Sequence, residues 1–319
     1  MDIYELQSLV RRIIDGENYM HTPADLYAPI EYTMRLGGKR LRPTMLLAAC
    51  QLFGGRVEDA HNAAIAIEVF HNYTLLHDDL MDKSPLRRGQ PTVYRRWSEN
   101  TAILSGDTMM ALAYQYVAAS PKSEQMLPVF SQTALDVMAG QQYDMEFENR
   151  IDVSAEEYLE MIYLKTAALF CGAMKMGAML ADAPAADIER LMLYGRYLGL
   201  AFQLQDDILD TYGNEVTFGK KPGQDIRDNK KTMLLITALN DADAAQRDAL
   251  LRQMESPESD AKVDAVRAIY DAVGVREKVE KVIDDYMRRA AEAINAVNVS
   301  NEAKQPFQEL MQQLIGRKN

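Results

Sequence analysis

The chain has 319 residues, of which 48% are hydrophobic and 26% are charged, so it can bury a sizeable core and fold as a globular protein. Its net charge of −12 argues against a nucleic acid as the partner. The sequence contains no uninterrupted apolar run long enough to cross a bilayer, so we do not expect an integral membrane protein.

The N-terminal segment at 2–16 has the pattern of a charged amphipathic helix and not of a signal peptide. Two cysteines, Cys50 and Cys171, lie within apolar helical patterns. Buried reduced thiols are the expected state, although the pattern alone leaves a disulfide open. Together these features predict a cytoplasmic location.

Glycine and proline are sparse, and the segments between them show helical periodicity with almost no strand alternation, so we predict an all-α fold. Ser154 and Glu157 form the pattern of a capping box, and Gly54 follows a predicted helix end. No low-complexity linker interrupts the chain, which predicts a single domain over 1–319. The predicted helices are 2–16, 24–36, 42–53, 58–81, 98–119, 122–147, 154–164, 166–181, 185–211, 232–240, 243–254, 259–272, 276–296 and 301–315.

Three carboxylates end the predicted helix 58–81. Asp78 and Asp82 are four residues apart and so share one helix face, with Asp79 beside them. Two acids on an apolar helix are costly to bury unless a cation neutralises them, and oxygen ligands suit Mg²⁺. Arg87 and Arg88 follow and can donate hydrogen bonds to phosphate oxygens. The segment therefore predicts a metal–diphosphate site.

A second copy of this pattern ends the predicted helix 185–211. Asp206, Asp207 and Asp210 again stand at i, i+1 and i+4 after an apolar run. One such motif occurs by chance at solvated helix ends, but two on apolar helices, each followed by basic residues, are a stronger signal. We expect the six carboxylates to face one another across a helical cavity and to hold several Mg²⁺ ions.

The loop 37–43 places Lys39, Arg40 and Arg42 at the start of a helix, with Pro43 in its first turn. Positive charge is disfavoured at a helix N-terminus unless an anion binds there, which predicts an anion site. The alternative is a solvated basic turn.

Two further basic segments are candidates for phosphate contacts. Lys165 and Thr166 lie in a largely apolar stretch, where they indicate either a helix break with the lysine directed into a cavity or a snorkelling lysine. The segment 211–234 is predicted to be a non-helical lid carrying Lys221 and Lys230, or else a solvated basic loop. Other acids are expected to be structural or solvated: Asp107, Asp136, Asp144, Glu146 and Glu148.

Taken together, these motifs resemble the trans-polyprenyl diphosphate synthase family, which includes farnesyl and geranylgeranyl diphosphate synthases. The resemblance covers residues 37–232 and implies an isoprenoid-synthase-type helical bundle around a deep central cavity, usually a homodimer. The matching segments are GGKRLRP at 37–43, HNYTLLHDDLMDKSPLRRGQPT at 71–92, Lys165-Thr166, GLAFQLQDDILD at 199–210 and GKKPGQDIRDNKKT at 219–232.

The resemblance also implies roles for individual residues. The Mg²⁺ ligands, with three ions expected per active site, would be Asp78, Asp82 and Asp206, supported by Asp79, Asp207 and Asp210. Isopentenyl diphosphate would bind Lys39, Arg42, His71 and Arg88. The allylic diphosphate would contact Arg87, Lys165, Thr166, Gln203, Lys221 and Lys230.

The implied activity is Mg²⁺-dependent, head-to-tail condensation of isopentenyl diphosphate with dimethylallyl, geranyl or farnesyl diphosphate. Tyr73 lies five residues before Asp78, about 7.5 Å along the helix, and would block a growing chain after a few additions. A single aromatic there predicts a C15 or C20 product, with a slight preference for C20, and Phe70 one turn deeper is the other candidate floor. The alternatives are a terpene cyclase and a Mg²⁺-dependent phosphohydrolase acting on prenyl diphosphates.

Overall fold

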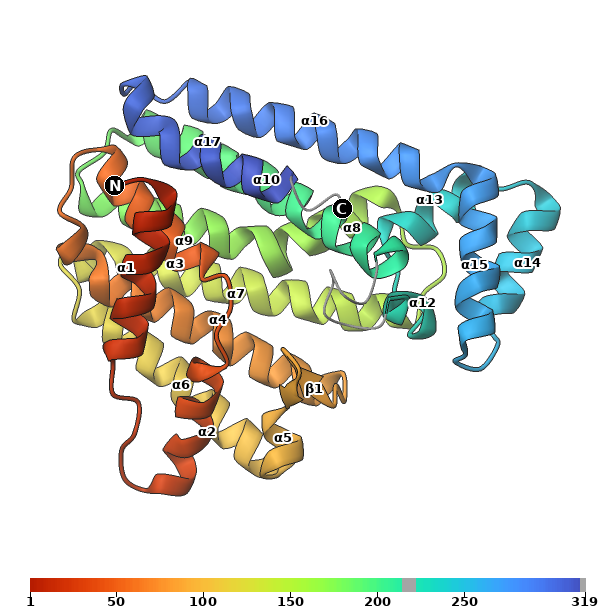
Figure 1. Cartoon of the computed structure of the whole chain (residues 1–319), viewed down its shortest axis with the longest axis horizontal. Coiled ribbons are helices and arrows are strands. Elements are labelled where there is room, and N and C mark those ends of the chain that lie inside the picture. Colours follow the sequence, from red (N-terminus) through yellow and green to blue (C-terminus); the bar gives the residue numbers. More distant parts are fainter. Residues whose placement is uncertain (214–221, 316–319) are drawn as a thin grey trace. The chain divides into compact units, whose positions relative to one another are not determined.

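The computed structural model describes residues 1–213 and 222–315, and the regular secondary structure of this part of the chain is helical apart from one short hairpin. The predicted all-α fold is therefore confirmed (Figure 1). The α-helices are α1 Ile3–Gly16, α2 Ala24–Arg35, α3 Leu41–Leu52, α4 His61–Met81, α5 Val93–Arg96, α6 Glu99–Ala118, α7 Ser123–Glu148, α8 Ala155–Ile162, α9 Ala168–Leu180, α10 Ala185–Tyr212, α12 Gln224–Arg227, α13 Met233–Asp241, α14 Ala244–Met254, α15 Asp260–Val273, α16 Val275–Asn295 and α17 Asn301–Ile315. The remaining elements are the 3₁₀ turn η1 Val57–Ala60, the π turn η2 Tyr163–Ala167 and the strands β1 Leu86–Arg87 and β2 Gln90–Pro91.

Local signals explain why most helix ends lie where the sequence predicts them. Ser154 accepts a hydrogen bond from the backbone N–H of Glu157 at 3.1 Å, and the Glu157 carboxylate accepts one from the Ser154 N–H at 2.9 Å, which is a complete capping box. Gly54 follows α3 with a φ of 76°, the left-handed conformation that glycine adopts without strain.

The structure differs from the sequence prediction at several places. Between α4 and α6 it contains the hairpin β1–β2 and the short helix α5, which the sequence does not predict. The predicted helix 58–81 begins as the 3₁₀ turn η1 and becomes α-helical at His61. The segment 211–234 was predicted to lack helix, whereas α10 continues to Tyr212 and α12 forms at Gln224–Arg227. The break predicted at Lys165 and Thr166 is a π turn, η2, that joins α8 to α9.

Contacts divide the chain into two compact units, which are described separately. The first unit comprises Met1–Thr133, Leu169–Met192 and Ile294–Leu310, and the second comprises Ala134–Ala168, Leu193–Ala293 and Met311–Asn319. Several helices, α7 and α10 among them, contribute residues to both units. The single domain over 1–319 stays a prediction.

Helix α4 forms the centre of the first unit. It packs along α6 and also contacts α1, α2 and α3, as Figure 1 shows for α6. Every residue from Ala63 to Phe70 is buried, because this part of α4 is surrounded by other helices on all sides. The C-terminal turn emerges from the core, where Met81 is 44% exposed. The acidic C-terminal turn of α4 therefore follows a segment of the helix that is fixed in the core.

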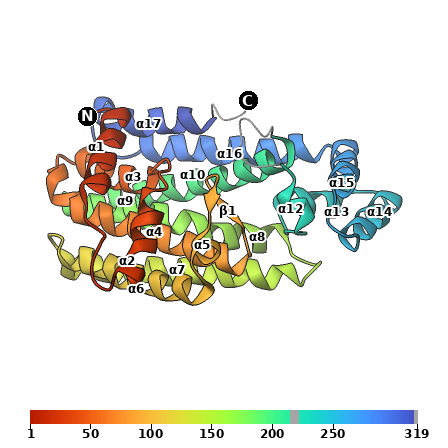
Figure 2. The same ribbon diagram turned by 60° about the horizontal axis from the view of Figure 1, so that its bottom comes forward.

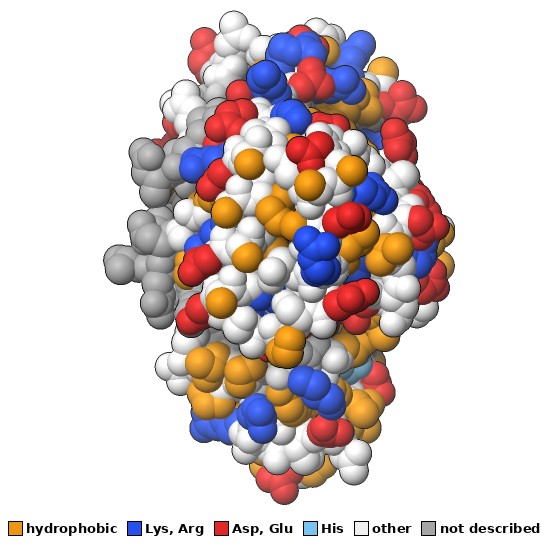
Figure 3. All heavy atoms as spheres, turned by 90° about the vertical axis from the view of Figure 1, so that its right-hand side faces the viewer, with side chains coloured by type: hydrophobic (Ala, Val, Ile, Leu, Met, Phe, Trp, Pro, Cys, Tyr) orange, Lys and Arg blue, Asp and Glu red, His pale blue; other side chains and the backbone are white. Residues whose placement is uncertain are grey.

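In the second unit, α12, α13 and α14 all contact α15 (Figure 2). Their shared core contains Leu250, Val266 and Tyr270, all of which are buried. Figure 3 faces the part of the chain that carries α14 and α15, where acidic and basic side chains are interspersed with apolar ones. This cluster supports the segment that leads from α12 to α13.

Both cysteines are buried thiols of the first unit, as the reduced-thiol prediction requires. The Sγ of Cys50 donates to the carbonyl of Arg56 at 3.5 Å, and that of Cys171 donates to the carbonyl of Met192 at 3.3 Å. Burial raises the pKa of the Cys50 thiol to about 11. Among the helices of the described residues, none has the length and apolar composition that crossing a bilayer requires.

Candidate active site

The first acid motif lies at the C-terminal turn of α4, where its three carboxylates have different surroundings. Asp79 is buried and accepts hydrogen bonds from Nε of Arg87 at 2.9 Å and from Nη2 at 2.5 Å. Asp78 is partly exposed, with its Oδ2 3.9 Å from the same Nη2, and Asp82 is exposed. The motif therefore directs one carboxylate into the protein and two toward its surface.

A two-residue hairpin turn places Arg87 against this motif. Strands β1 and β2 pair antiparallel, with Arg87 opposite Gln90. The two turn residues, Arg88 and Gly89, have φ values of 53° and 74°, the left-handed conformations that such a turn requires. This turn sends Arg87 toward Asp79 and leaves Arg88 free to point toward the loop that precedes α3.

The loop before α3 and the start of that helix carry two of the predicted substrate-binding residues, Lys39 and Arg42, and a third, Arg88, contacts the loop. Nη1 of Arg88 donates to the carbonyl of Gly37. Gly38 has a φ of 125°, a conformation that favours glycine, and it lies directly against the Arg88 guanidinium. Lys39 is exposed on the same loop.

Arg42 is held in a defined orientation by two neighbours. Its guanidinium carbon lies 4.5 Å above the centre of the Phe170 ring, and Nη1 lies 3.2 Å from Nε2 of His71. Burial and the charge of Arg42 lower the pKa of His71 well below its usual value. The imidazole is therefore neutral, and its Nε2 accepts a hydrogen bond from the guanidinium, which has no acceptor atom.

Arg40 has a different environment from the one that the sequence suggested. It forms a buried ion pair with Glu68 of α4 and donates to the carbonyl of Met34 at 2.5 Å. Asn72 also donates to the Glu68 carboxylate, at 2.8 Å. Of the three cations grouped at this helix start, Arg40 thus anchors the loop to α4, while Lys39 is exposed and Arg42 is half-buried.

The second acid motif lies near the end of α10 and is more deeply buried than the first, because both Asp207 and Asp210 are buried. Asp207 is buried and accepts hydrogen bonds from the Tyr158 hydroxyl and, at 3.0 Å, from Nε2 of Gln203. Asp206 is partly exposed, and Asp210 accepts from the backbone N–H of Asp225 at 2.9 Å. Burial raises the pKa of Asp207 to about 7, against the opposing effect of its two hydrogen bonds.

The π turn η2 brings Lys165 and Thr166 into this unit's polar cluster. Oγ1 of Thr166 donates to Oε1 of Gln203 at 3.0 Å, which links the turn to α10. Nζ of Lys165 lies 2.7 Å from Oδ2 of Asp144 on α7. Lys230, which follows α12, reaches the same Oδ2 at 3.3 Å. Lys221, which is also predicted to contact the allylic diphosphate, lies outside the described residues.

Two aromatic rings upstream of the first motif occupy the positions considered for the floor of the cavity. Tyr73 is half-buried, with its ring centre 5.6 Å from that of Phe70 and 4.8 Å from that of His77. Phe70 is fully buried and packs edge-on against Phe130 at 5.4 Å. Tyr73 is therefore the more accessible of the two rings.

Within 1–213 and 222–315, no three His, Cys, Asp or Glu side chains are grouped closely enough to enclose a metal ion without other ligands. Mg²⁺ in proteins is usually bound through one or two carboxylates, waters and substrate phosphates. The exposed oxygens of Asp78 and Asp82 have the donor chemistry for that role. Asp79 and Asp207 are engaged by protein donors, which suits support of the neighbouring ligands.

Several residues with contacts to the predicted site residues carry no local signal in the sequence. Asp144, expected to be structural or solvated, contacts both Lys165 and Lys230. Tyr158 and Glu68 were not singled out at all. Each of them contacts a residue far away in the chain, so local spacing carries no signal for these contacts.

Comparison with known proteins identifies the family. The model of the family described as polyprenyl synthetase matches residues 23–273, which include both acid motifs. The short chain isoprenyl diphosphate synthase of Methanothermobacter thermautotrophicus is 38% identical over 283 residues, covering 88% of this chain and 87% of the relative. The geranylfarnesyl diphosphate synthase of Natronomonas pharaonis is 32% identical over 335 residues, covering 99% and 96%.

Solved structures agree over the full length. A crystal structure of a geranylgeranyl pyrophosphate synthase matches with a TM-score of 0.95 and 39% identity, covering 100% of both chains. A geranylgeranyl pyrophosphate synthase from Corynebacterium glutamicum, complexed with isoprenyl diphosphate and magnesium, matches with a TM-score of 0.89 and 25% identity, also covering 100% of both chains. The chain belongs to the polyprenyl synthetase family, and its enzymatic class is that of a short-chain prenyltransferase.

Proposed function

We propose that the protein condenses isopentenyl diphosphate head to tail with an allylic diphosphate and releases diphosphate, with geranylgeranyl diphosphate as the main product. The observation that carries this proposal is the presence of a set of cations in each of the two units. Lys39, Arg42 and Arg88 lie in the first unit, and Lys165 and Lys230 lie in the second. A reaction between two diphosphates needs two such sets, whereas a hydrolase or a cyclase needs one.

Mg²⁺ is the proposed cofactor, with three ions per active site. Asp78, Asp82 and Asp206 would bind it, and Asp79, Asp207 and Asp210 would support them. The bound metal would offset the negative charge of the diphosphate. The magnesium named in the Corynebacterium glutamicum structure supports this choice.

The protein's own cations would stabilise the departing diphosphate of the allylic substrate. Arg87, Lys165 and Lys230 would face the negative charge that grows as the C–O bond breaks. The double bond of isopentenyl diphosphate would attack the allylic cation to form the C–C bond, and a proton would then pass to the released diphosphate. Oxygens of Thr166 and Gln203, fixed by their mutual hydrogen bond, would steady the cation.

Tyr73 would set the product length, because it is the more accessible ring below Asp78. The test is an incubation of the protein with Mg²⁺, isopentenyl diphosphate and each of the C5, C10 and C15 starters, followed by mass spectrometry of the products. Wild type should yield mainly C20, and Tyr73→Ala should yield longer chains. Chelation of Mg²⁺ with EDTA should abolish elongation by wild type and by Tyr73→Ala. The control variant Tyr4→Ala, on the exposed face of α1, should give the same product length as wild type.

Other outcomes would redirect the proposal. Unchanged length in Tyr73→Ala would move the floor to Phe70, and a C15 product would correct the preferred length. Phosphate release without consumption of isopentenyl diphosphate would instead indicate a phosphohydrolase. A cyclic product made from one prenyl diphosphate alone would indicate a terpene cyclase.

We also propose a homodimer that works in the cytoplasm. Exposed apolar side chains on α6 (Ile103, Leu104) and on α7 (Leu135, Met138) support self-association, since they are 37% to 60% exposed. The two free cysteines fit a reducing compartment.

A further inference from the structure

We propose that Asp144 is a positioning residue that brings the ammonium groups of Lys165 and Lys230 together to form the cationic half of the allylic diphosphate site. The inference rests on the proposed function. Asp144 itself would touch neither substrate nor metal; it would act through the two lysines. The contacts that carry it all lie within the second unit.

The first contact is between α7 and the π turn. A Cβ on Gly140 would lie 2.2 Å from the backbone nitrogen of Lys165, so only glycine allows α7 to approach the turn this closely. Asp144 is four residues further along α7 and therefore on the same face. Its Oδ2 lies 2.7 Å from Nζ of Lys165. One face of α7 thus fixes both the backbone and the charged end of this lysine.

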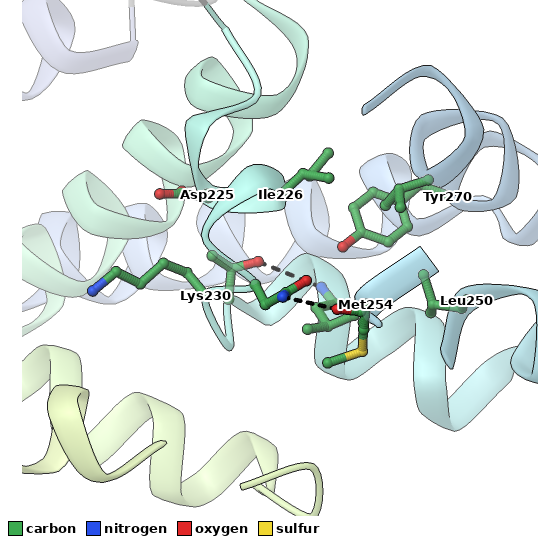
Figure 4. Close-up of a pocket in the computed structure, with 10 residues that line it drawn as sticks. Asp225, Ile226, Lys230, Leu250, Met254 and Tyr270 are labelled. Carbon is green, nitrogen blue, oxygen red and sulfur yellow. Dashed lines mark hydrogen bonds between the residues drawn. The ribbon is translucent and has the colours of Figure 1, made fainter. Parts of the chain in front are cut away.

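The second contact fixes Lys230. The segment from α12 to α13 is anchored where Ile226 meets Leu250, Met254 and Tyr270 around a small pocket, and Asn229 donates to the carbonyl of Met254 at 3.0 Å. Figure 4 shows the side chain of Lys230 pointing away from this apolar cluster.

Lys230 points instead to α7. There its Nζ lies 3.3 Å from Oδ2 of Asp144 and 3.0 Å from Oε1 of Glu148. The same Asp144 oxygen thus binds lysines from two segments that are far apart in the sequence.

The charges explain why a carboxylate is needed at this position. Two ammonium groups near one oxygen repel each other, and only an intervening negative charge lets them stay together before substrate binds. The Asp144 side chain is 14% exposed, and those of Lys165 and Lys230 are 26% and 19% exposed, so water screens the group only in part. The two lysines hold the pKa of Asp144 below its usual value despite the burial that would raise it. The carboxylate therefore stays charged, and a diphosphate meets two cations already in position.

The test is the variant Asp144→Asn, with Glu146→Gln as the matched control. Glu146 is an exposed acid on the same helix, and its hydrogen bond is to Gln142 of that helix. Steady-state kinetics would give kcat and a separate KM for each substrate. We expect Asp144→Asn to raise the KM for the allylic diphosphate about 10-fold to 100-fold and to lower kcat, while the KM for isopentenyl diphosphate changes less than about threefold. The control should leave all three constants near wild type.

Two further variants separate positioning from folding. Asp144→Glu keeps the charge and should recover most of the lost affinity for the allylic diphosphate. In a Lys165→Met background, Asp144→Asn should raise the KM for the allylic diphosphate much less than it does in wild type, because one of the cations that Asp144 positions is gone. If Asp144→Asn lacks a cooperative melting transition, Asp144→Glu and Lys165→Met remain available for the same comparison.

Three results would overturn the inference. The first is an unchanged KM for the allylic diphosphate in a folded Asp144→Asn variant. The second is an equal rise in the KM values for both substrates. The third is that the effects of Asp144→Asn and Lys165→Met on the allylic KM are fully additive. Failure of the proposed function would look different, because wild-type protein would then elongate no starter at all.

Discussion

At the scale of single residues, His71 gives the folded protein a defined response to acid. Its pKa is well below 6.5 in the folded state, because of burial and the neighbouring Arg42, and close to 6.5 when unfolded. As pH falls through 6.5, the unfolded chain takes up a proton that the folded chain does not, so acid favours unfolding. The cost reaches about 1.4 kcal/mol one pH unit below the unfolded pKa.

This predicts that His71→Gln loses less stability than wild type between about pH 7.5 and pH 5.5. Urea denaturation at the two pH values measures the difference, with the exposed His21→Gln as control. Equal acid-induced losses in wild type and His71→Gln would show that His71 is not the group responsible.

The buried pair Arg40–Glu68 leads to a second prediction at this scale. Both side chains are almost fully buried, so removing one charge leaves the other without compensation. Glu68→Gln should therefore lower the free energy of unfolding by about 3 kcal/mol or more. The double variant Arg40→Met with Glu68→Leu should be less destabilised than the single one. A single variant as stable as wild type would mean that the pair contributes little to anchoring the loop before α3.

At the scale of elements, the approach of α7 to the π turn η2 depends on Gly140. The added methyl group of Gly140→Ala would lie 2.2 Å from a backbone nitrogen, which cannot move without shifting the turn. We expect a loss of about 1–3 kcal/mol in the free energy of unfolding, as in overpacked cores. We also expect a fall in kcat, because Lys165 and Thr166 move with the turn. The exposed neighbour Ala139→Ser should leave both stability and activity near wild type.

The helices and strands differ in how well the sequence alone predicts them. Apolar periodicity and caps such as Ser154 placed the helices, because those signals are local. The strands β1 and β2 are too short for alternation to be visible, and α12 has only four residues. The sequence predicts an interruption of the helix at Lys165, but it does not predict that this interruption is the π turn η2.

The sequence indicates which residue types gather at the site, but it does not predict their contacts. Duplicated acid motifs and basic loops identify a diphosphate site by residue type alone. Asp144 was misjudged because its contacts come from η2 and from the segment after α12, which only the folded chain brings to α7. Arg40 was grouped with its neighbouring cations for the same reason, since its partner Glu68 is 28 residues away.

At the scale of the whole molecule, the proposed homodimer can be tested through α7. Leu135 and Met138 stand three residues apart on one face, and they are 60% and 37% exposed. The double variant Leu135→Glu with Met138→Glu should weaken self-association, since it places charges where the partner would bury apolar surface. Sedimentation velocity would show a shift from dimer toward monomer.

The matched control is Tyr4→Glu, which adds the same charge at an exposed aromatic on α1. It should leave the dimer intact. Wild-type protein that sediments as a monomer at micromolar concentration would refute the homodimer, and a double variant that stays dimeric would move the interface elsewhere.

The labelling rates of the two buried cysteines can report on local opening of the first unit. Because the thiolate is the species that alkylating reagents attack, a buried thiol with a pKa of about 11 is protected near neutral pH until its surroundings open. Cys50 and Cys171 come from helices α3 and α9 of that unit, so their labelling rates would measure opening at two places in one experiment. Equal rates would indicate that the two helices open together, and unequal rates would indicate which of them opens first. A diphosphate substrate that binds the closed form should slow both rates, so ligand affinity can be measured on the natural cysteines, without an engineered labelling site.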